Sequence, residues 1–260
     1  MPAPPHPTKM FSSARLLKGI RSLILGPRVV RRRTLHEVAR IVSHQLGGHY
    51  VGDDYKLWLR EDEFVEKFKQ LSPHNYFSME RKFTLKEFAK HTLNMEGAVA
   101  ECGSYVGVSA WFMAREIGGS DFFLFDSFEG LSEPKTQDQS PSDVPQWMAG
   151  DLASTEELLK RNLAEFENVH ILKGWIPDRF AEVGDRQFKL VHIDVDLYQP
   201  TLDSLEFFYH RMIPGGVIIM DDYGFENCPG AHQAAIQFMN ARSENIIQLA
   251  TGQGVIIRHC

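Results

Sequence analysis

The sequence predicts an α/β protein with a doubly wound, mostly parallel, Rossmann-like sheet, preceded by an N-terminal helical arm. From about residue 97 onwards, short apolar runs alternate with helical patterns. Several of these runs end in a glycine turn or in aspartate, and two more runs lie close together near the end of the chain. Continuous apolar strands that alternate with helices are typical of parallel sheets covered on both faces.

The composition is that of an ordinary soluble globular chain. Of its 260 residues, 43% are hydrophobic and 24% are charged, and no stretch approaches the roughly 18 uncharged apolar residues of a membrane-spanning helix. Cys102, Cys228 and Cys260 are odd in number and widely spaced, which argues against a disulfide framework or a cysteine zinc site. We therefore expect a cytoplasmic protein with one α/β domain and an N-terminal arm.

Residues 1–33 form a basic arm that we expect to be partly disordered. The arm holds eight Lys and Arg residues and no acid, and without these eight charges the formal net charge of −6 becomes −14. So acidic a body is a poor nucleic-acid surface, and no such partner is expected. Apolar residues between Met10 and Ile24 follow helical spacing. A membrane-surface or transit-peptide helix is one interpretation, but we favour packing on the domain or on a second subunit, without stable membrane insertion.

The remaining chain divides into a segment at 34–96, which looks helical, and a sheet domain at 97–260. The predicted strands are 97–102, 121–126, 169–172, 188–194 and 216–221, followed by an antiparallel pair at 246–249 and 254–258. The predicted helices are 108–116, 154–165, 201–212 and 231–241. Ser154 is the expected N-cap of its helix, with Glu157 as its capping-box partner.

A long polar insertion at about 132–153 follows the second predicted strand. Long loops at this edge of a parallel sheet are commonly lids over a ligand, and a disordered loop is the alternative interpretation. Trp147 and Met148 are apolar enough to dock such a lid.

The first predicted strand ends in a turn that suits a nucleoside ligand. Glu101, Gly103 and Gly107 form an acid-x-Gly-x-x-x-Gly pattern, in which glycine permits a tight turn and a close ligand approach. The spacing differs from the G-x-G-x-x-G turn that holds a pyrophosphate, which favours a ligand with an amino-acid portion. Asp126 ends the second strand, where ribose hydroxyls bind in doubly wound folds, although it would also cap the turn that follows. Trp175 follows the third strand and is a candidate wall for an adenine, or a core residue.

Three further carboxylates end the fourth and fifth predicted strands: Asp194, Asp221 and Asp222. The two strands are neighbours in a doubly wound sheet, about 5 Å apart, so these acids converge at the ligand edge. Carboxylates packed this closely repel unless a cation lies among them, and an all-oxygen set favours Mg²⁺ or another hard divalent cation. Capping of the following helices would explain one such acid but not three. Strand alternation places His192, Asp194 and Asp196 on one side, and we expect His192 to be hydrogen-bonded within the strand rather than to bind the ion.

These residues resemble a known family. VHIDVDLYQPTLDSLE at 191–206 and PGGVIIMDDYG at 214–224 are similar to the macrocin-type O-methyltransferases of antibiotic biosynthesis, as are DSFEGL at 126–131 and TGQGVII at 251–257. The resemblance covers about residues 78–258. One departure is the first loop, which is usually richer in glycine than YVGVS at 105–109.

The resemblance implies a seven-stranded class I methyltransferase fold that binds S-adenosylmethionine and magnesium. It implies that Asp194, Asp221 and Asp222 hold the metal and that Asp196 is the catalytic base. It places the cofactor over Glu101, Gly103 and Asp126, with Ser109, Ser127 and Trp175 nearby. It also implies a homo-oligomer.

We therefore expect methyl transfer to a hydroxyl of a small-molecule acceptor, such as the vicinal diol or catechol of a sugar or natural product. Chelation of two neighbouring oxygens by the cation would lower the pKa of one hydroxyl, and Asp196 would remove its proton. Two alternatives remain open from the sequence: a metal-dependent hydrolase or phosphotransferase, and a catalytically silent protein that binds an adenosine ligand. The Gly-Lys-Ser/Thr loop expected of the phosphotransferase is absent.

Overall fold

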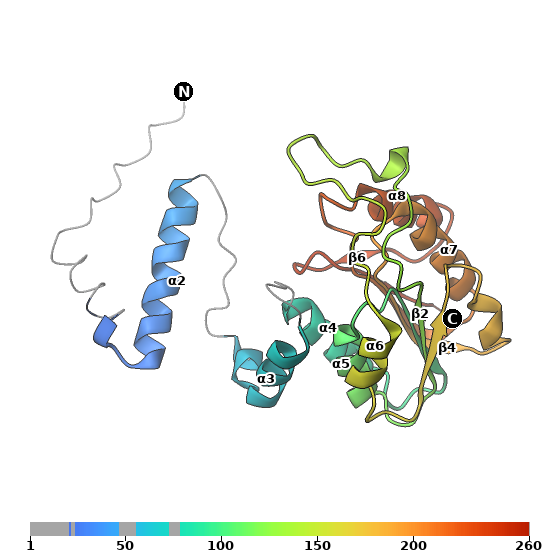
Figure 1. Cartoon of the computed structure of the whole chain (residues 1–260), viewed down its shortest axis with the longest axis horizontal. Coiled ribbons are helices and arrows are strands. Elements are labelled where there is room, and N and C mark those ends of the chain that lie inside the picture. Colours follow the sequence, from blue (N-terminus) through green and yellow to red (C-terminus); the bar gives the residue numbers. More distant parts are fainter. Residues whose placement is uncertain (1–20, 22–23, 47–55, 73–78, 260) are drawn as a thin grey trace. The chain divides into compact units, whose positions relative to one another are not determined.

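The computed structural model describes residue 21 and residues 24–46, 56–72 and 79–259 (Figure 1). The proline-rich start and most of the predicted helical face between Met10 and Ile24 lie outside these described residues. The chain divides into two compact units, residues 1–62 and 63–260, which we describe separately.

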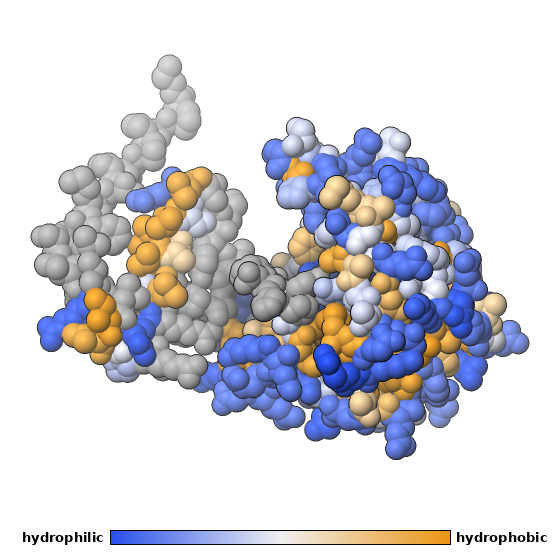
Figure 2. Space-filling model, in the orientation of Figure 1, coloured by the Kyte–Doolittle hydropathy of each residue, from blue (hydrophilic) through white to orange (hydrophobic). Residues whose placement is uncertain are grey.

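The first unit contains helix α2 (Arg28–Gln45) and the short 3₁₀ helix η1 (Leu57–Arg60). Helix α2 continues through residue 33, so the backbone shows no break between the predicted arm and the helical segment that follows it. Leu35, Val38 and Val42 are exposed at spacings of three and four residues, and Figure 2 shows apolar side chains along this helix. In the described part of the chain, every helix is too short or too polar to cross a bilayer.

The second unit is built on a seven-stranded sheet with the order β3-β2-β1-β4-β5-β7-β6. Its strands are β1 (Ala98–Cys102), β2 (Phe122–Asp126), β3 (Val169–Lys173), β4 (Phe188–Ile193), β5 (Met212–Met220), β6 (Ile247–Gln248) and β7 (Gly254–Ile257). Strands β1 to β5 pair in parallel, whereas β7 pairs antiparallel with both β5 and β6. The predicted parallel sheet and its terminal antiparallel pair are therefore confirmed.

The strand order reverses between β1 and β4, which lie side by side although the chain visits β2 and β3 between them. The crossovers on either side of such a point lie on opposite faces of the sheet and leave a crevice at the carboxyl ends of the strands. In the register, Cys102 of β1 pairs with Ile193 of β4, so the glycine turn and the Asp194 turn begin at the same level.

The helices of this unit are α3 (Asp62–Leu71), α4 (Met79–His91), α5 (Val108–Glu116), α6 (Glu156–Asn162), α7 (Tyr198–Tyr209) and α8 (Pro229–Met239). Helix α4 packs on α5, and α7 packs on α8 (Figure 1). The ring of Phe64 in α3 lies 4.6 Å from that of Phe112 in α5. Helices α3 and α4 therefore belong to the compact unit, which begins at Glu63 rather than at residue 97.

Two predicted details that bear on the site are wrong. The N-cap of α6 is Thr155, whose side chain accepts from the N–H of Leu158, rather than Ser154. Ser154 instead donates to the carbonyl of Tyr105 in the glycine turn at 3.0 Å. Strand β4 ends at Ile193, and Asp196 has a left-handed backbone with φ 57°, so the predicted alternation does not extend to Asp196.

Candidate active site

A cavity of about 470 Å³ opens at the carboxyl edge of the sheet, where the strand order reverses. Its walls come from the turns after β1, β2, β3 and β4, from helices α3, α4, α5 and α7, and from the segment 132–153. Five of the six predicted cofactor residues line it: Gly103, Ser109, Asp126, Ser127 and Trp175.

Gly103 is required by the packing of β1 against β4. Its φ is +81°, and a Cβ at this position would lie 1.8 Å from the carbonyl oxygen of Asp194. The sequence attributed the glycine to close approach of a ligand, but the closest approach in the structure is that of the neighbouring strand's backbone. Any side chain here would push apart the two turns that form the floor of the cavity.

Asp126 braces the glycine turn. Its Oδ2 accepts from the backbone N–H groups of Ser104 and Tyr105, both at 2.8 Å, and its Oδ1 accepts from Phe128 N–H at 2.7 Å. The capping interpretation of Asp126 thus holds for three backbone donors. The carboxylate still lines the cavity, so it remains available to a ligand.

Glu101 is not brought to the cavity with the other five. It is fully buried in β1, and its Oε1 lies 2.9 Å from Nδ1 of His192 in β4. The reason is the strand pairing, in which Glu101 stands opposite His192 inside the sheet. Within the described part of the chain its Oε2 is buried with no hydrogen-bond partner.

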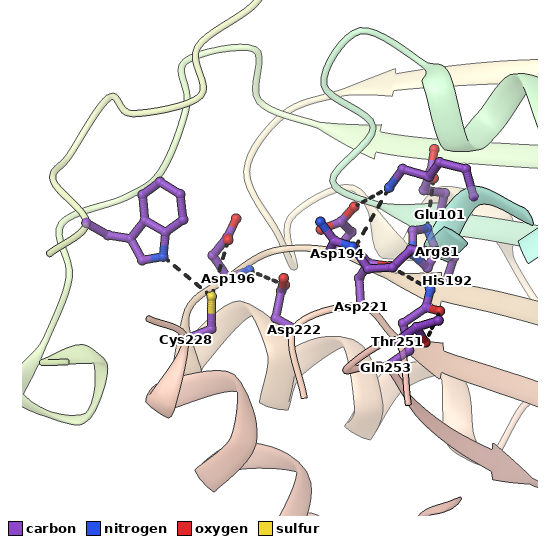
Figure 3. A network of polar contacts seen from close by, with 12 residues as sticks. Arg81, Glu101, His192, Asp194, Asp196, Asp221, Asp222, Cys228, Thr251 and Gln253 are labelled. Atoms are coloured by element: carbon purple, nitrogen blue, oxygen red, sulfur yellow. Dashed lines mark hydrogen bonds and ion pairs between the residues drawn. The ribbon is translucent and has the colours of Figure 1, made fainter. Parts of the chain in front are cut away.

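The strand-end acids form two neighbouring groups (Figure 3). In the first, ligand atoms of His192, Asp194 and Asp221 lie within 4.8 Å of one another; in the second, atoms of Asp196, Asp222 and Cys228 do. The predicted metal ligands thus meet at one edge but are divided between the groups.

The second group holds the Asp196 turn. Asp222 Oδ2 accepts from the backbone N–H of Asp196 at 2.9 Å, and the Cys228 thiol donates to Asp196 Oδ1 at 3.5 Å. Asp196 lines the cavity although only 8% of its surface is exposed.

Two cations from α4 complete the site, and sequence reasoning missed both. Arg81 donates to Asp221 Oδ2, and Lys82 Nζ lies 3.5 Å from Asp194 Oδ2 and 3.8 Å from Asp221 Oδ2. No local pattern in the segment 34–96 marks them, because only the packing of α4 on the sheet edge brings them to the acids.

Asp221 is the most fully paired of these acids. Besides Arg81, its Oδ1 accepts from Gln253 Nε2 at 2.8 Å and lies 3.3 Å from His192 Nε2. His192 is hydrogen-bonded within the sheet, as expected, with one ring nitrogen at Glu101 and the other at Asp221.

The pKa shifts set Asp221 and His192 apart from Asp194, Asp196 and Asp222. Burial opposes the charge of Asp221, but Lys82, Arg81 and His192 outweigh it and hold the pKa of Asp221 well below its usual range. Burial likewise opposes a charged His192, but its bonds to Asp221 and Glu101 raise its pKa to about 9. Asp221 is therefore an anion within a compensated cluster at neutral pH.

The other three acids lack sufficient positive charge. Burial and then Asp221 raise the pKa of Asp194, and burial and then Asp194 raise that of Asp196 to about 7. Burial followed by Asp196 and Asp194 raises the pKa of Asp222 well above its usual value. Mutual repulsion of buried carboxylates has this effect.

This donor set fits a hard divalent cation. It is dominated by carboxylate oxygen, and an added positive charge would relieve the repulsion among Asp194, Asp196 and Asp222. Asp194 is best placed to receive an ion, since it lines the cavity and its side chain is 24% exposed. Asp221 joins such a set only by sharing its carboxylate with Arg81.

Comparison with known proteins gives consistent matches. The family model described as macrocin-O-methyltransferase (TylF) matches residues 79–251. Mycinamicin III 3''-O-methyltransferase from Micromonospora griseorubida is 27% identical over 193 residues, covering 65% of this chain and 75% of that protein. The 8-demethyl-8-(2,3-dimethoxy-alpha-L-rhamnosyl)-tetracenomycin-C 4'-O-methyltransferase of Streptomyces olivaceus is 29% identical over 149 residues, covering 52% of this chain and 56% of that protein. The solved structure of the O-methyltransferase NovP has the same fold, with a TM-score of 0.59 and 23% identity, covering 72% of this chain and 84% of NovP.

Proposed function

Because this chain belongs to the macrocin O-methyltransferase (TylF) family, and is thus an S-adenosylmethionine-dependent O-methyltransferase, we propose that it methylates one hydroxyl of a vicinal diol. The diol is carried by a sugar or a related natural product, and a divalent cation assists the reaction. The observation on which this proposal rests is the set of Asp194, Asp196 and Asp222 beside the cavity, of which Asp196 and Asp222 are buried and all three have too little positive charge nearby. Of the two relatives named above, one is named as a methyltransferase of a rhamnosyl-bearing tetracenomycin and the other as a methyltransferase of mycinamicin III, which supports the acceptor class.

In this proposal, the cofactor binds in the part of the cavity that the glycine turn forms. Gly103 and Ser109 line this part, and Asp126 accepts from the backbone of the turn and lines the same space. Ser127 and the partly exposed Trp175 line the cavity beside them. Glu101 takes no direct part, because it is enclosed between the strands with His192.

The metal ligands are Asp194, Asp222 and, through its shared carboxylate, Asp221. A bound Mg²⁺ at these acids would lower the pKa of an acceptor hydroxyl and orient the neighbouring oxygen. The chain's own contribution is to hold the acids rigidly: Asp221 by Gln253 and His192, and Asp222 by its bond to the Asp196 turn.

Asp196 is the general base. Its carboxylate takes the proton of the acceptor hydroxyl, and the oxygen then forms a bond to the sulfonium methyl carbon while the carbon–sulfur bond breaks. The products are the methyl ether and S-adenosylhomocysteine, with the proton on Asp196. Much of the acceleration comes from holding the acceptor in line with the methyl group.

The test is a methyl-transfer assay with labelled S-adenosylmethionine on paired acceptors, one a vicinal diol and the other its monodeoxy analogue. We expect transfer to the diol only, loss of transfer with EDTA, and recovery with Mg²⁺ or Mn²⁺. Asp194→Asn should abolish both metal binding and transfer, whereas Asp121→Asn, at the opposite edge of the sheet, should keep both.

Transfer that is unaffected by EDTA, or equal on the monodeoxy analogue, would contradict the role of the metal. Calorimetric binding of S-adenosylmethionine without transfer to any acceptor would instead favour a catalytically silent binding protein.

A further inference from the structure

One acid of the segment 132–153 is buried although most of its neighbours are exposed. Asp138, the last residue of the 3₁₀ helix η2 (Thr136–Asp138), is only 5% exposed. A carboxylate is buried at a tolerable cost only where it receives hydrogen bonds. Asp138 receives two from backbone N–H groups: one from Lys135 at 2.8 Å within the segment, and one from Tyr198 at 2.6 Å across the fold.

The bond to Tyr198 supplies a cap that helix α7 lacks. Tyr198 is the first residue of α7, and Leu197, at the N-cap position, has no side chain that can cap the helix. The first N–H groups of a helix need acceptors and favour a negative charge, and Asp138 provides both from 60 residues away.

The receiving surface is shaped for this carboxylate. A Cβ on Gly230 of α8 would lie 1.9 Å from Asp138 Oδ1 and 2.8 Å from the Tyr198 nitrogen. Glycine at 230 is therefore necessary for Asp138 to reach α7.

Tyr198, the residue that Asp138 contacts, lies two residues after Asp196, the proposed base. Asp196 lies in a left-handed turn with φ 57°, which Asp222 holds on one side through the Asp196 N–H. Asp138 holds the other side through Tyr198.

A second route joins the same segment to Asp196. The indole N–H of Trp147 donates to Cys228 Sγ at 3.5 Å, and that thiol contacts Asp196 Oδ1 at 3.5 Å. Ser140 adds a bond from its hydroxyl to the carbonyl of Asn227 at 3.2 Å. The segment is thus attached to the turns before both α7 and α8.

We propose that Asp138 is a positioning residue that couples closure of the segment 132–153 to the orientation of Asp196. When the segment is docked, Asp138 caps α7 and fixes the turn that carries the base. When the segment leaves, the turn loses the support that Asp138 gives it through Tyr198. This inference rests on the proposed role of Asp196. Because the segment also lines the cavity, through Ser132, Glu133, Lys135, Asp138 and Leu152, its docking encloses the reactants and orders the base in one event.

The test compares Asp138→Ala with Asp143→Ala, which removes an exposed acid from the same segment. Lys135 is the only Lys or Arg in 132–153, so tryptic cleavage after it, followed by mass spectrometry, reports undocking. We expect Asp138→Ala to speed this cleavage about tenfold. Its kcat should fall by about tenfold to a hundredfold while the KM for S-adenosylmethionine changes by less than about threefold. Asp138→Asn keeps one acceptor oxygen, so its cleavage rate and kcat should lie between those of the wild type and Asp138→Ala. Asp143→Ala should match the wild type in both.

Gly230→Ala gives an independent variant, since its methyl group would displace the carboxylate without removing it. It should reproduce both effects, and the double variant Asp138→Ala/Gly230→Ala should be less impaired than the sum of the singles. The proposed coupling between the segment and Asp196 would be overturned if Asp138→Ala kept the cleavage rate and kcat of the wild type. It would also be overturned if the effects of Asp138→Ala and Gly230→Ala were fully additive in the double variant. If the wild type transfers no methyl group at all, the proposed function fails, while the cleavage experiment still decides whether Asp138 anchors the segment.

Discussion

The backbone N–H of Asp196 donates to Oδ2 of Asp222 at 2.9 Å, so a hydrogen bond joins the proposed base directly to a proposed metal ligand. The bond joins the turn after β4 to the turn after β5 and holds Asp196 at φ 57°, a backbone conformation that a non-glycine residue seldom adopts. Asp222 therefore has two separable roles: its charge would attract the metal, and its oxygen holds the backbone of the Asp196 turn.

Replacement of Asp222 should separate these roles. Asp222→Asn keeps an oxygen that can accept from Asp196, so we expect near-normal thermal stability but weaker Mn²⁺ binding by calorimetry. Asp222→Ala loses the acceptor as well and should lower the free energy of unfolding by about 1–3 kcal/mol more than Asp222→Asn does. Equal stability of the two variants would show that the bond does not support the turn.

Arg81 should compete with a divalent cation for Asp221. Its guanidinium donates to Asp221 Oδ2 and its side chain is 16% exposed, whereas the Asp221 side chain is fully buried. Arg81→Met removes this positive charge but keeps an apolar stem, so the remaining acids should attract a metal more strongly. We expect a lower melting temperature without metal and a larger rise on addition of Mn²⁺ than in the wild type. A smaller rise would mean that Arg81 helps to build the metal site rather than competing for it.

Asp126 should matter for both stability and cofactor binding. Asp126→Ala leaves three backbone N–H groups of the glycine turn and its neighbour without their acceptor. We expect the free energy of unfolding to fall by about 2 kcal/mol or more, and the Kd of S-adenosylmethionine to rise about tenfold. Asp151→Ala is the matched control, because Asp151 also accepts a backbone N–H, from Met148, but lies outside the cavity lining. Unchanged binding in Asp126→Ala would exclude the cofactor role of this turn.

Glu244 should contribute to acid unfolding. It is buried and accepts from Tyr209 Oη at 2.5 Å and from His259 N–H at 3.1 Å, in addition to the Arg258 guanidinium. Burial opposes its charge, but these hydrogen bonds hold the pKa of Glu244 well below its usual range.

A carboxyl whose pKa is lowered by folding stabilises the protein above its unfolded pKa of about 4.3, and this contribution is lost as the pH falls through the folded value. Glu244→Gln should therefore be less stable than the wild type at pH 7, with a difference that narrows below about pH 4 in urea titrations. A difference that is constant with pH would mean that the charge of Glu244 contributes nothing.

Local patterns in the sequence were enough to predict the sheet and the convergence of its acids. Apolar strands that alternate with helices indicate a parallel sheet covered on both faces. Parallel strands bring Asp194, Asp221 and Asp222 to the same edge. Hydrophobic periodicity and strand-end position are local properties, so a single sequence displays them. The family resemblance was visible in the same motifs, and the matched family model confirms it.

The surroundings of those acids depend on long-range packing and became visible only in the folded chain. Arg81 and Lys82 come from α4, Gln253 from the turn before β7, and Asp138 from an insertion that looked merely polar. Glu101 likewise proved to lie outside the cavity lining, since its partner His192 lies on the adjacent strand. Long-range pairs of this kind depend on how helices pack on the sheet, and the spacing of residues along the chain does not encode which distant donor reaches a given carboxylate.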